Sequence, residues 1–79
     1  MKIRVYVSLK NGVLDPVGVT VKGALNRMGF HNVSDVRTGK FIELDVAQND
    51  RAKAEAEVKV MCEKLLANTV IEDYKIVAA

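Results

Sequence analysis

Residues 2–9 alternate strictly between apolar and polar side chains, and this pattern constrains the fold more than any other stretch. The apolar members are Ile3, Val5, Val7 and Leu9, and the polar ones are Lys2, Arg4, Tyr6 and Ser8. Because successive side chains of a strand point to opposite faces, the pattern predicts a β-strand with one covered and one open face. The rest of the chain, or another molecule, must therefore cover the apolar face.

The first candidate for that cover is a helix that begins at Asp15-Pro16 and ends at Gly29. An aspartate caps free N–H groups, proline suits the first helical position, and glycine suits a left-handed cap. The predicted apolar stripe consists of Val17, Val21, Ala24, Leu25 and Met28. Val19 and Gly23 lie together on the opposite face, where an interior glycine costs about 1 kcal/mol relative to alanine. Either the glycine arose at this position by neutral drift, or another backbone packs closely against it.

A second helix is predicted between a cap at Asn49-Asp50 and a stop at Asn68. Its predicted buried stripe consists of Ala54, Val58, Met61, Cys62 and Leu65. Val60 falls instead on the charged side of the helix, where a lone exposed valine usually has no special role. We nevertheless treat it as a candidate contact with another chain.

The second extended region is predicted to run from Val33 to Val46. Its second half alternates, with Ile42, Leu44 and Val46 on one side and Phe41, Glu43 and Asp45 on the other. Thr38-Gly39-Lys40 interrupts the run, as a tight hairpin turn or as a glycine bulge in one long bent strand. The short flanking segments favour the long bent strand. A last strand is expected over Val70 to Val77.

This order of elements predicts an α+β fold of the split βαβ kind, related to the ferredoxin-like folds. Such a fold has an antiparallel sheet with both helices on one face, and residues 1–79 would form a single domain. A core this small rarely supplies more than roughly 3–5 kcal/mol. We therefore predict a homodimer, or a tetramer of paired dimers, in which extended strands of two chains complete each other's sheet.

No motif in the chain predicts catalysis. His31 has no partner of a kind that would make a base or a metal site, and Cys62 lies on an apolar stripe near a helix end. Phosphate-binding loops and nucleophile elbows are absent from the sequence. We therefore expect no catalytic residue, no metal and no cofactor in this chain.

Net charge, hydropathy and the cysteine content limit the classes of partner and the cellular compartment that we expect. The net charge is only +2, with 12 basic and 10 acidic residues interleaved, which is unlike the one-sided basic stripe of a nucleic-acid-binding protein. No apolar run approaches the roughly 20 residues that cross a membrane. The single cysteine favours a reduced thiol in a cytoplasmic protein. We expect neither nucleic acid nor membrane as a partner.

The densest charged group, Asp35, Arg37, Lys40 and Glu43, belongs to the second extended region. It could bind an anion or a partner protein, although charge on the open side of a strand more often serves solubility and edge protection.

Three long segments, SLKNGVLDPVG, DVRTGKFIEL and MCEKLLANTVIEDY, closely resemble the PurS family, the small subunits of phosphoribosylformylglycinamidine synthase. Family positions and outward-facing residues together make our predicted interface set: Asp15, Pro16, Gly18, Val19, Gly23, Asp35, Arg37, Gly39, Lys40, Phe41, Glu43, Val60, Asn68 and Tyr74.

The resemblance implies a non-catalytic subunit of a purine-biosynthesis ligase. It would bridge a large synthetase subunit, which uses ATP, and a glutaminase subunit, which uses glutamine, and would assist ammonia transfer between them. The alternative is a small-ligand-binding regulatory domain of similar topology. An RNA-binding module shares the topology too, but it stacks bases on sheet aromatics, and this chain has only two Tyr and two Phe.

Overall fold

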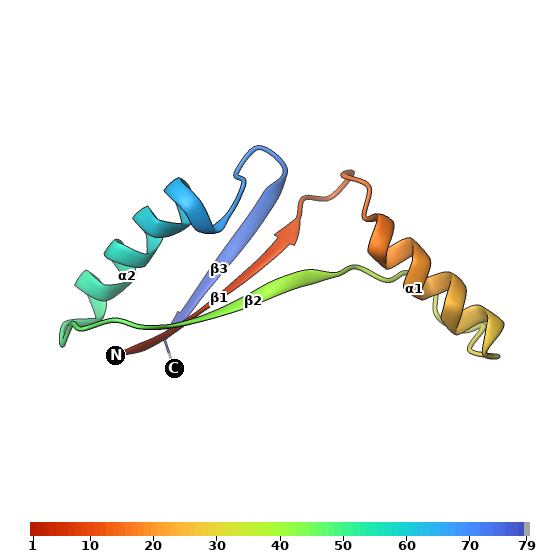
Figure 1. The fold of residues 1–79 in the computed structure, drawn as a ribbon, viewed down its shortest axis with the longest axis horizontal. Helices are drawn as coiled ribbons and strands as arrows, with labels where there is room; N and C mark the ends of the chain where they lie inside the picture. Colours follow the sequence, from red (N-terminus) through yellow and green to blue (C-terminus); the bar gives the residue numbers. More distant parts are fainter. Residues whose placement is uncertain (79) are drawn as a thin grey trace.

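The computed structural model describes residues 1–78, and Ala79, the last residue of the predicted domain, lies outside the described residues. The elements in order are β1 (Lys2–Leu9), α1 (Pro16–Arg27), β2 (Gly39–Asp45), α2 (Arg51–Met61), the π-helical turn η1 (Cys62–Leu66) and β3 (Glu72–Ala78). The three strands form one sheet in the order β2-β1-β3, and β1 is antiparallel to both neighbours (Figure 1). The predicted α+β class and antiparallel sheet are confirmed.

Strand β1 is the central strand of the sheet. Its alternation places one apolar face in the core. Val5, for example, pairs with Ile42 of β2 and Ile76 of β3. The buried side chains of β1, α2 and the start of η1 pack together as one cluster: Ile3, Val5, Val7, Ala54, Val58 and Cys62. The opposite face of the sheet, with Tyr6 and Phe41, is open.

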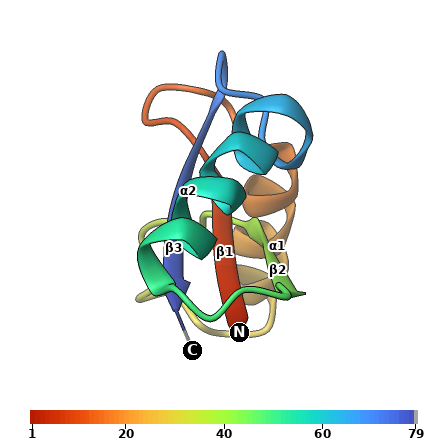
Figure 2. The same cartoon turned by 90° about the vertical axis from the view of Figure 1, so that its left-hand side faces the viewer.

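Helix α2 lies across the apolar face of the sheet (Figure 2). It begins as predicted, because Asp50 Oδ1 accepts hydrogen bonds from the N–H groups of Ala52 and Lys53 at 2.9 and 3.3 Å. It does not end as predicted. A π-helical turn has more residues per turn than an α-helix, so it rotates Leu65 outward, to 83% exposure.

The neighbour Leu66 packs against the core in the place expected for Leu65. Met61 is likewise 38% exposed. The prediction of burial was therefore wrong for Leu65 and Met61, whereas Ala54, Val58 and Cys62 are buried as predicted.

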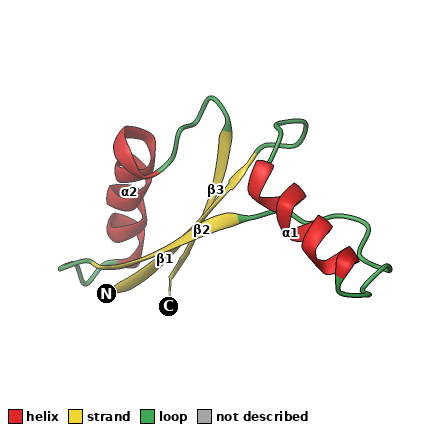
Figure 3. Ribbon diagram, turned by 45° about the vertical axis from the view of Figure 1, so that its right-hand side comes forward, coloured by secondary structure: helices red, strands yellow, loops and turns green. Residues whose placement is uncertain are grey.

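Helix α1 does not cover the sheet beside α2, in contrast to the expected arrangement with both helices on one face. It projects beyond the end of the sheet, so that α1 and α2 lie at opposite ends of the molecule (Figure 3). The described chain measures 49 × 25 × 14 Å and its radius of gyration is 15.9 Å, against about 12 Å for a compact domain of this length. We call residues 16–36, α1 with the segment that returns along it, the arm.

The second extended region is shorter than predicted. Only Gly39–Asp45 pairs with β1, and residues 33–38 form neither a strand nor one arm of a hairpin. The prediction of one long bent strand was therefore wrong. The reason is a contact between distant residues, because Val36 and Thr38 meet the first turn of α1 and its cap instead of a neighbouring strand.

Candidate interaction surfaces

The arm is joined to the sheet at one buried carboxylate. Asp15, only 3% exposed, caps α1 by accepting a hydrogen bond from Gly18 N at 2.9 Å on Oδ1. Its Oδ2 accepts from Thr38 N at 2.6 Å, and the Thr38 hydroxyl lies 3.0 Å from both carboxylate oxygens. The Thr38 N–H, then the Gly18 N–H, lower the pKa of Asp15 below its ordinary value, and the charge of Arg37 adds to this. Asp15 is therefore ionised at neutral pH.

Several predicted residues lie around this carboxylate. Pro16 opens the helix, and Arg37 donates a hydrogen bond to the carbonyl oxygen of Lys10 at 3.2 Å. Gly39 starts β2, where an added Cβ would lie 2.5 Å from the Val7 carbonyl oxygen. Together these residues form a junction between the β1–α1 loop, α1 and β2. Sequence reasoning missed Thr38, because periodicity and capping rules do not say which distant N–H groups will meet a cap.

Two glycines of α1 have opposite surroundings, which gives a direct test of the junction. A Cβ at Gly18 would overlap the carbonyl oxygen of Val36, whereas a Cβ at Gly23 would meet only the flexible end of Arg27 at 3.4 Å. Gly23→Ala is expected to stabilise α1 by about 1 kcal/mol, because alanine favours a helix interior. Gly18→Ala is expected to destabilise the junction by about 1–3 kcal/mol, because the overlap forces the backbone to move.

Amide hydrogen exchange of α1 measures both effects in the same helix. Gly23→Ala serves as the control for helix propensity. Protection that rises in both variants would show that Gly18 is not a close-packing position.

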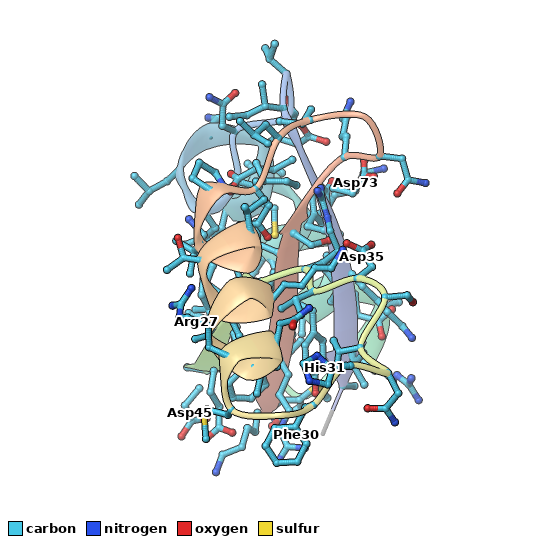
Figure 4. The ribbon with its side chains drawn as sticks, turned by 90° about the vertical axis from the view of Figure 1, so that its right-hand side faces the viewer. Arg27, Phe30, His31, Asp35, Asp45 and Asp73 are labelled. Atoms are coloured by element: carbon cyan, nitrogen blue, oxygen red, sulfur yellow. The ribbon has the colours of Figure 1, made fainter. Side chains whose placement is uncertain are left out.

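The uncovered apolar surface of α1 is the largest departure from an ordinary monomer. Val17, Val19 and Met28 are 60, 60 and 70% exposed, and Leu14 and Phe30 beside them are also exposed. Figure 4 looks at the arm from its outer side, with Phe30 and His31 at its far end and Asp35 on the returning segment. Of the predicted stripe, Val17, Val21 and Met28 are exposed and Ala24 and Leu25 are half-buried, so the pattern is present but only partly covered within this chain.

The open face of the sheet is a second uncovered surface. Tyr6 and Phe41 lie on adjacent strands with ring centroids 5.1 Å apart, and a hollow of about 340 Å³ lies beside them. Glu43 is paired with Lys2 and Arg4 at 3.3 Å each, and these hydrogen bonds, the one from Lys2 first, lower its pKa. Exposed ion pairs of this kind contribute little stability. Sequence reasoning missed the Tyr6–Phe41 pair, because it depends on the register between β1 and β2.

The remaining predicted residues do not join the junction. Asp35 is exposed and accepts a hydrogen bond only from the N–H of Val36, and Lys40 is exposed within β2. Asn68 shapes the turn before β3, because its side chain accepts from Val70 N at 3.2 Å and its carbonyl accepts from the N–H groups of Ile71 and Glu72.

Val60 belongs to α2, and Tyr74 of β3 contacts the π-helical turn that follows α2. The Tyr74 hydroxyl donates to Glu63 at 2.7 Å, and this bond raises the pKa of Tyr74 to about 12. Val60 is half exposed. The predicted interface set is therefore divided among three regions: the junction with the arm, the open sheet face, and the outer side of α2 with the turn that follows it.

Neither His31 nor Cys62 has a catalytic partner among the described residues. The ring of His31 contacts only Asn26, with Nδ1 2.7 Å from Oδ1. Cys62 is fully buried, and burial, with the charge of Glu63 second, raises the pKa of its thiol. Among residues 1–78 no group of three or more His, Cys, Asp or Glu side chains is placed to hold a metal ion, and no helix there is long and apolar enough to span a bilayer.

A three-stranded sheet with one open face and a projecting apolar arm define a class of protein. It is a small α+β subunit that acts by binding other chains. Comparison with known proteins agrees, since residues 2–79 match the profile of the PurS family, described as phosphoribosylformylglycinamidine (FGAM) synthase. The chain belongs to the PurS family.

Relatives and solved structures support this placement. The chain is 57% identical to the PurS subunit of phosphoribosylformylglycinamidine synthase from Bacillus subtilis over 74 residues, which are 94% of this chain and 87% of that protein. The fold matches a B. subtilis PurS crystal structure with a TM-score of 0.86 and 55% identity, covering 96% of this chain and 94% of the other. It also matches a chain in the structure of PurLQS from Thermotoga maritima, with a TM-score of 0.88 and 36% identity, covering 96% and 93%.

Proposed function

We propose that this chain is the non-catalytic small subunit of a phosphoribosylformylglycinamidine synthase in purine biosynthesis. The observation that carries the proposal is the arm, whose apolar surface is far more exposed than a monomer of this size needs. A structure of PurLQS that contains a chain like this one supports assembly with further subunits. No observation favours the alternative of a regulatory domain that binds a small ligand.

The subunit is proposed to bridge a synthetase subunit and a glutaminase subunit and to assist the passage of ammonia between them. ATP and glutamine are used by those partners, and this chain holds no cofactor of its own. The reduced, buried Cys62 suits a cytoplasmic location. Neither nucleic acid nor a membrane is among the proposed partners.

A second copy of this chain is proposed to cover much of the uncovered surface. Each copy carries both the apolar side of α1 and the open sheet face, so one two-fold contact can cover these surfaces on both chains at once. The second copy would also cover part of residues 41–46, where β2 forms an unpaired sheet edge. Sedimentation of the purified chain should show a dimer or tetramer at low micromolar concentration. A stable folded monomer would rule this out.

Co-purification tests the function itself. The tagged full chain, recovered from an extract of its own cells, is expected to bring down a synthetase and a glutaminase. Purified alone, it should show no glutaminase, ATPase or amidine-forming activity, because no nucleophile–base pair or phosphate loop is present. Turnover that survives removal of contaminants, or recovery without either enzyme, would contradict the proposal.

Val60 tests the outer side of α2 as a contact with another subunit. Val60→Glu is expected to change the free energy of unfolding by less than about 0.5 kcal/mol, as exposed substitutions usually do. A buried charge at an interface centre costs several times more, so glutamine-dependent activity of the reconstituted complex should fall about tenfold or more.

Ala52→Glu is the control, since it introduces the same side chain at an exposed position near the start of α2. Gly23→Glu tests the far face of α1 in the same way. Variants that assemble and support turnover like the parent would show that these positions are ordinary surface.

A further inference from the structure

One carboxylate, that of Asp15, holds the start of α1 to Thr38, which lies 23 residues further along the sequence. Asp15 accepts hydrogen bonds from Gly18 N in the first turn of α1 and from both Thr38 N and Thr38 Oγ1 just before β2. All of these donors lie within 3.0 Å of a carboxylate oxygen, and the residue is almost fully buried although most of the arm is exposed. The second helix has no such arrangement, because Asp50 contacts only its own first turn.

Because this contact lies at the base of the arm, a small change in it produces a large displacement at the far end. Figures 1 and 4 show the arm attached at its base and extending to a free end at Phe30 and His31. The 12 residues of α1 span about 18 Å at 1.5 Å per residue, so a rotation of about 10° at the base moves the far end by about 3 Å. Displacement on that scale is enough to misplace side chains in a packed interface.

We propose that Asp15 is a positioning residue, which fixes the direction of α1 so that a second copy of this chain can bind the arm. The proposal rests on the homodimer proposed above. A rigid arm binds more tightly than a swinging one, because less freedom is lost on association. Asp15 thereby acts on assembly through α1, without itself touching the second chain.

The chemistry of the contact shows how to separate positioning from helix capping. Serine caps helices about as well as aspartate, but it has one oxygen on a shorter side chain in place of the two carboxylate oxygens that separately meet Gly18 N and Thr38 N. Asp15→Ser should therefore keep α1 helical and release it from Thr38. Asp50→Ser makes the same chemical change at the cap of α2, where no second segment is held.

The experiment measures the direction of the arm and the strength of association separately. Spin labels on cysteines introduced by Arg27→Cys and Lys53→Cys report the distance from α1 to α2, because both positions are exposed and Cys62 is buried. Mixing the labelled chain with excess unlabelled chain restricts the signal to distances within one copy. Sedimentation equilibrium gives the dissociation constant, and far-UV circular dichroism gives the helix content.

Asp15→Ser is expected to broaden the distance distribution and to weaken association at least tenfold with unchanged helix content. Asp50→Ser should leave the distance and the association as in the parent. A narrow, unshifted distribution in Asp15→Ser would overturn the proposal, and so would a broad distribution with parental association. Failure of the homodimer would appear differently, as a parent chain that sediments as a monomer, and the assembly role of Asp15 would then be wrong as well.

Discussion

Replacing Val5 with alanine is expected to lower the free energy of unfolding by about 2–3 kcal/mol, from the loss of two buried methyl groups and the cavity that they leave. Val5 is completely buried at the centre of β1, between Ile42 and Ile76. A core of this size supplies only about 3–5 kcal/mol, so roughly half or more of the stability would be lost. The thermal midpoint should fall by about 10–20 °C.

Val60→Ala provides the control for this substitution. It removes the same two methyl groups from a half-exposed position on α2, and a change below about 0.5 kcal/mol is expected. Both variants are compared with the parent at one protein concentration, because association also stabilises the folded chain. Equal losses in the two variants would show that the cluster around β1 is not the main source of stability.

The second large effect is expected at the arm. Val21 lies in the middle of the apolar stripe of α1 and is 37% exposed, so Val21→Glu places a charge where a second copy is proposed to pack. Glutamate is a better helix former than valine, and the arm itself should remain folded. An uncompensated charge at the centre of an interface costs about 3 kcal/mol or more. Self-association measured by sedimentation should therefore weaken about 100-fold.

Thr20→Glu introduces the same charge at the preceding exposed residue of α1, which lies to the side of the apolar stripe, and is expected to weaken association much less. The comparison separates a local contact from a general effect of net charge, which is only +2 in the parent. If both variants associate like the parent, the apolar side of α1 is not an interface between copies. If both lose association equally, charge rather than packing controls it.

The division of the predicted interface set has a physical explanation. Asp15, Gly18 and Gly39 matter through the way one backbone approaches another, and their side chains or their lack of one make the junction possible. Phe41 and Val60, in contrast, are exposed side chains that contribute nothing to the core. The first group is therefore expected to act on the shape of the subunit, and the second on the surfaces that it presents.

The sequence by itself determined the alternating central strand, the helix caps at Asp15, Gly29 and Asp50, and the family. Alternation in residues 2–9 leaves only one way to bury four apolar side chains in a strand, and Asp50 and Gly29 satisfy local requirements that need no tertiary information. The absence of catalytic motifs could also be read directly. Such features depend on neighbours within a few residues, so they are visible in the chain.

Tertiary structure alone decided where α1 lies, which N–H groups meet Asp15, and which leucine at the end of α2 is buried. An apolar stripe predicts that a helix will be covered, but it does not indicate which chain covers it. Here α1 projects away from its own sheet (Figure 1). The π-helical turn exchanged Leu65 for Leu66 through the rotation of a single turn. Thr38 reached Asp15 only because the returning segment follows α1 instead of pairing with β1. In each case the outcome depends on contacts between distant residues, which compete with local preference and here prevail over it.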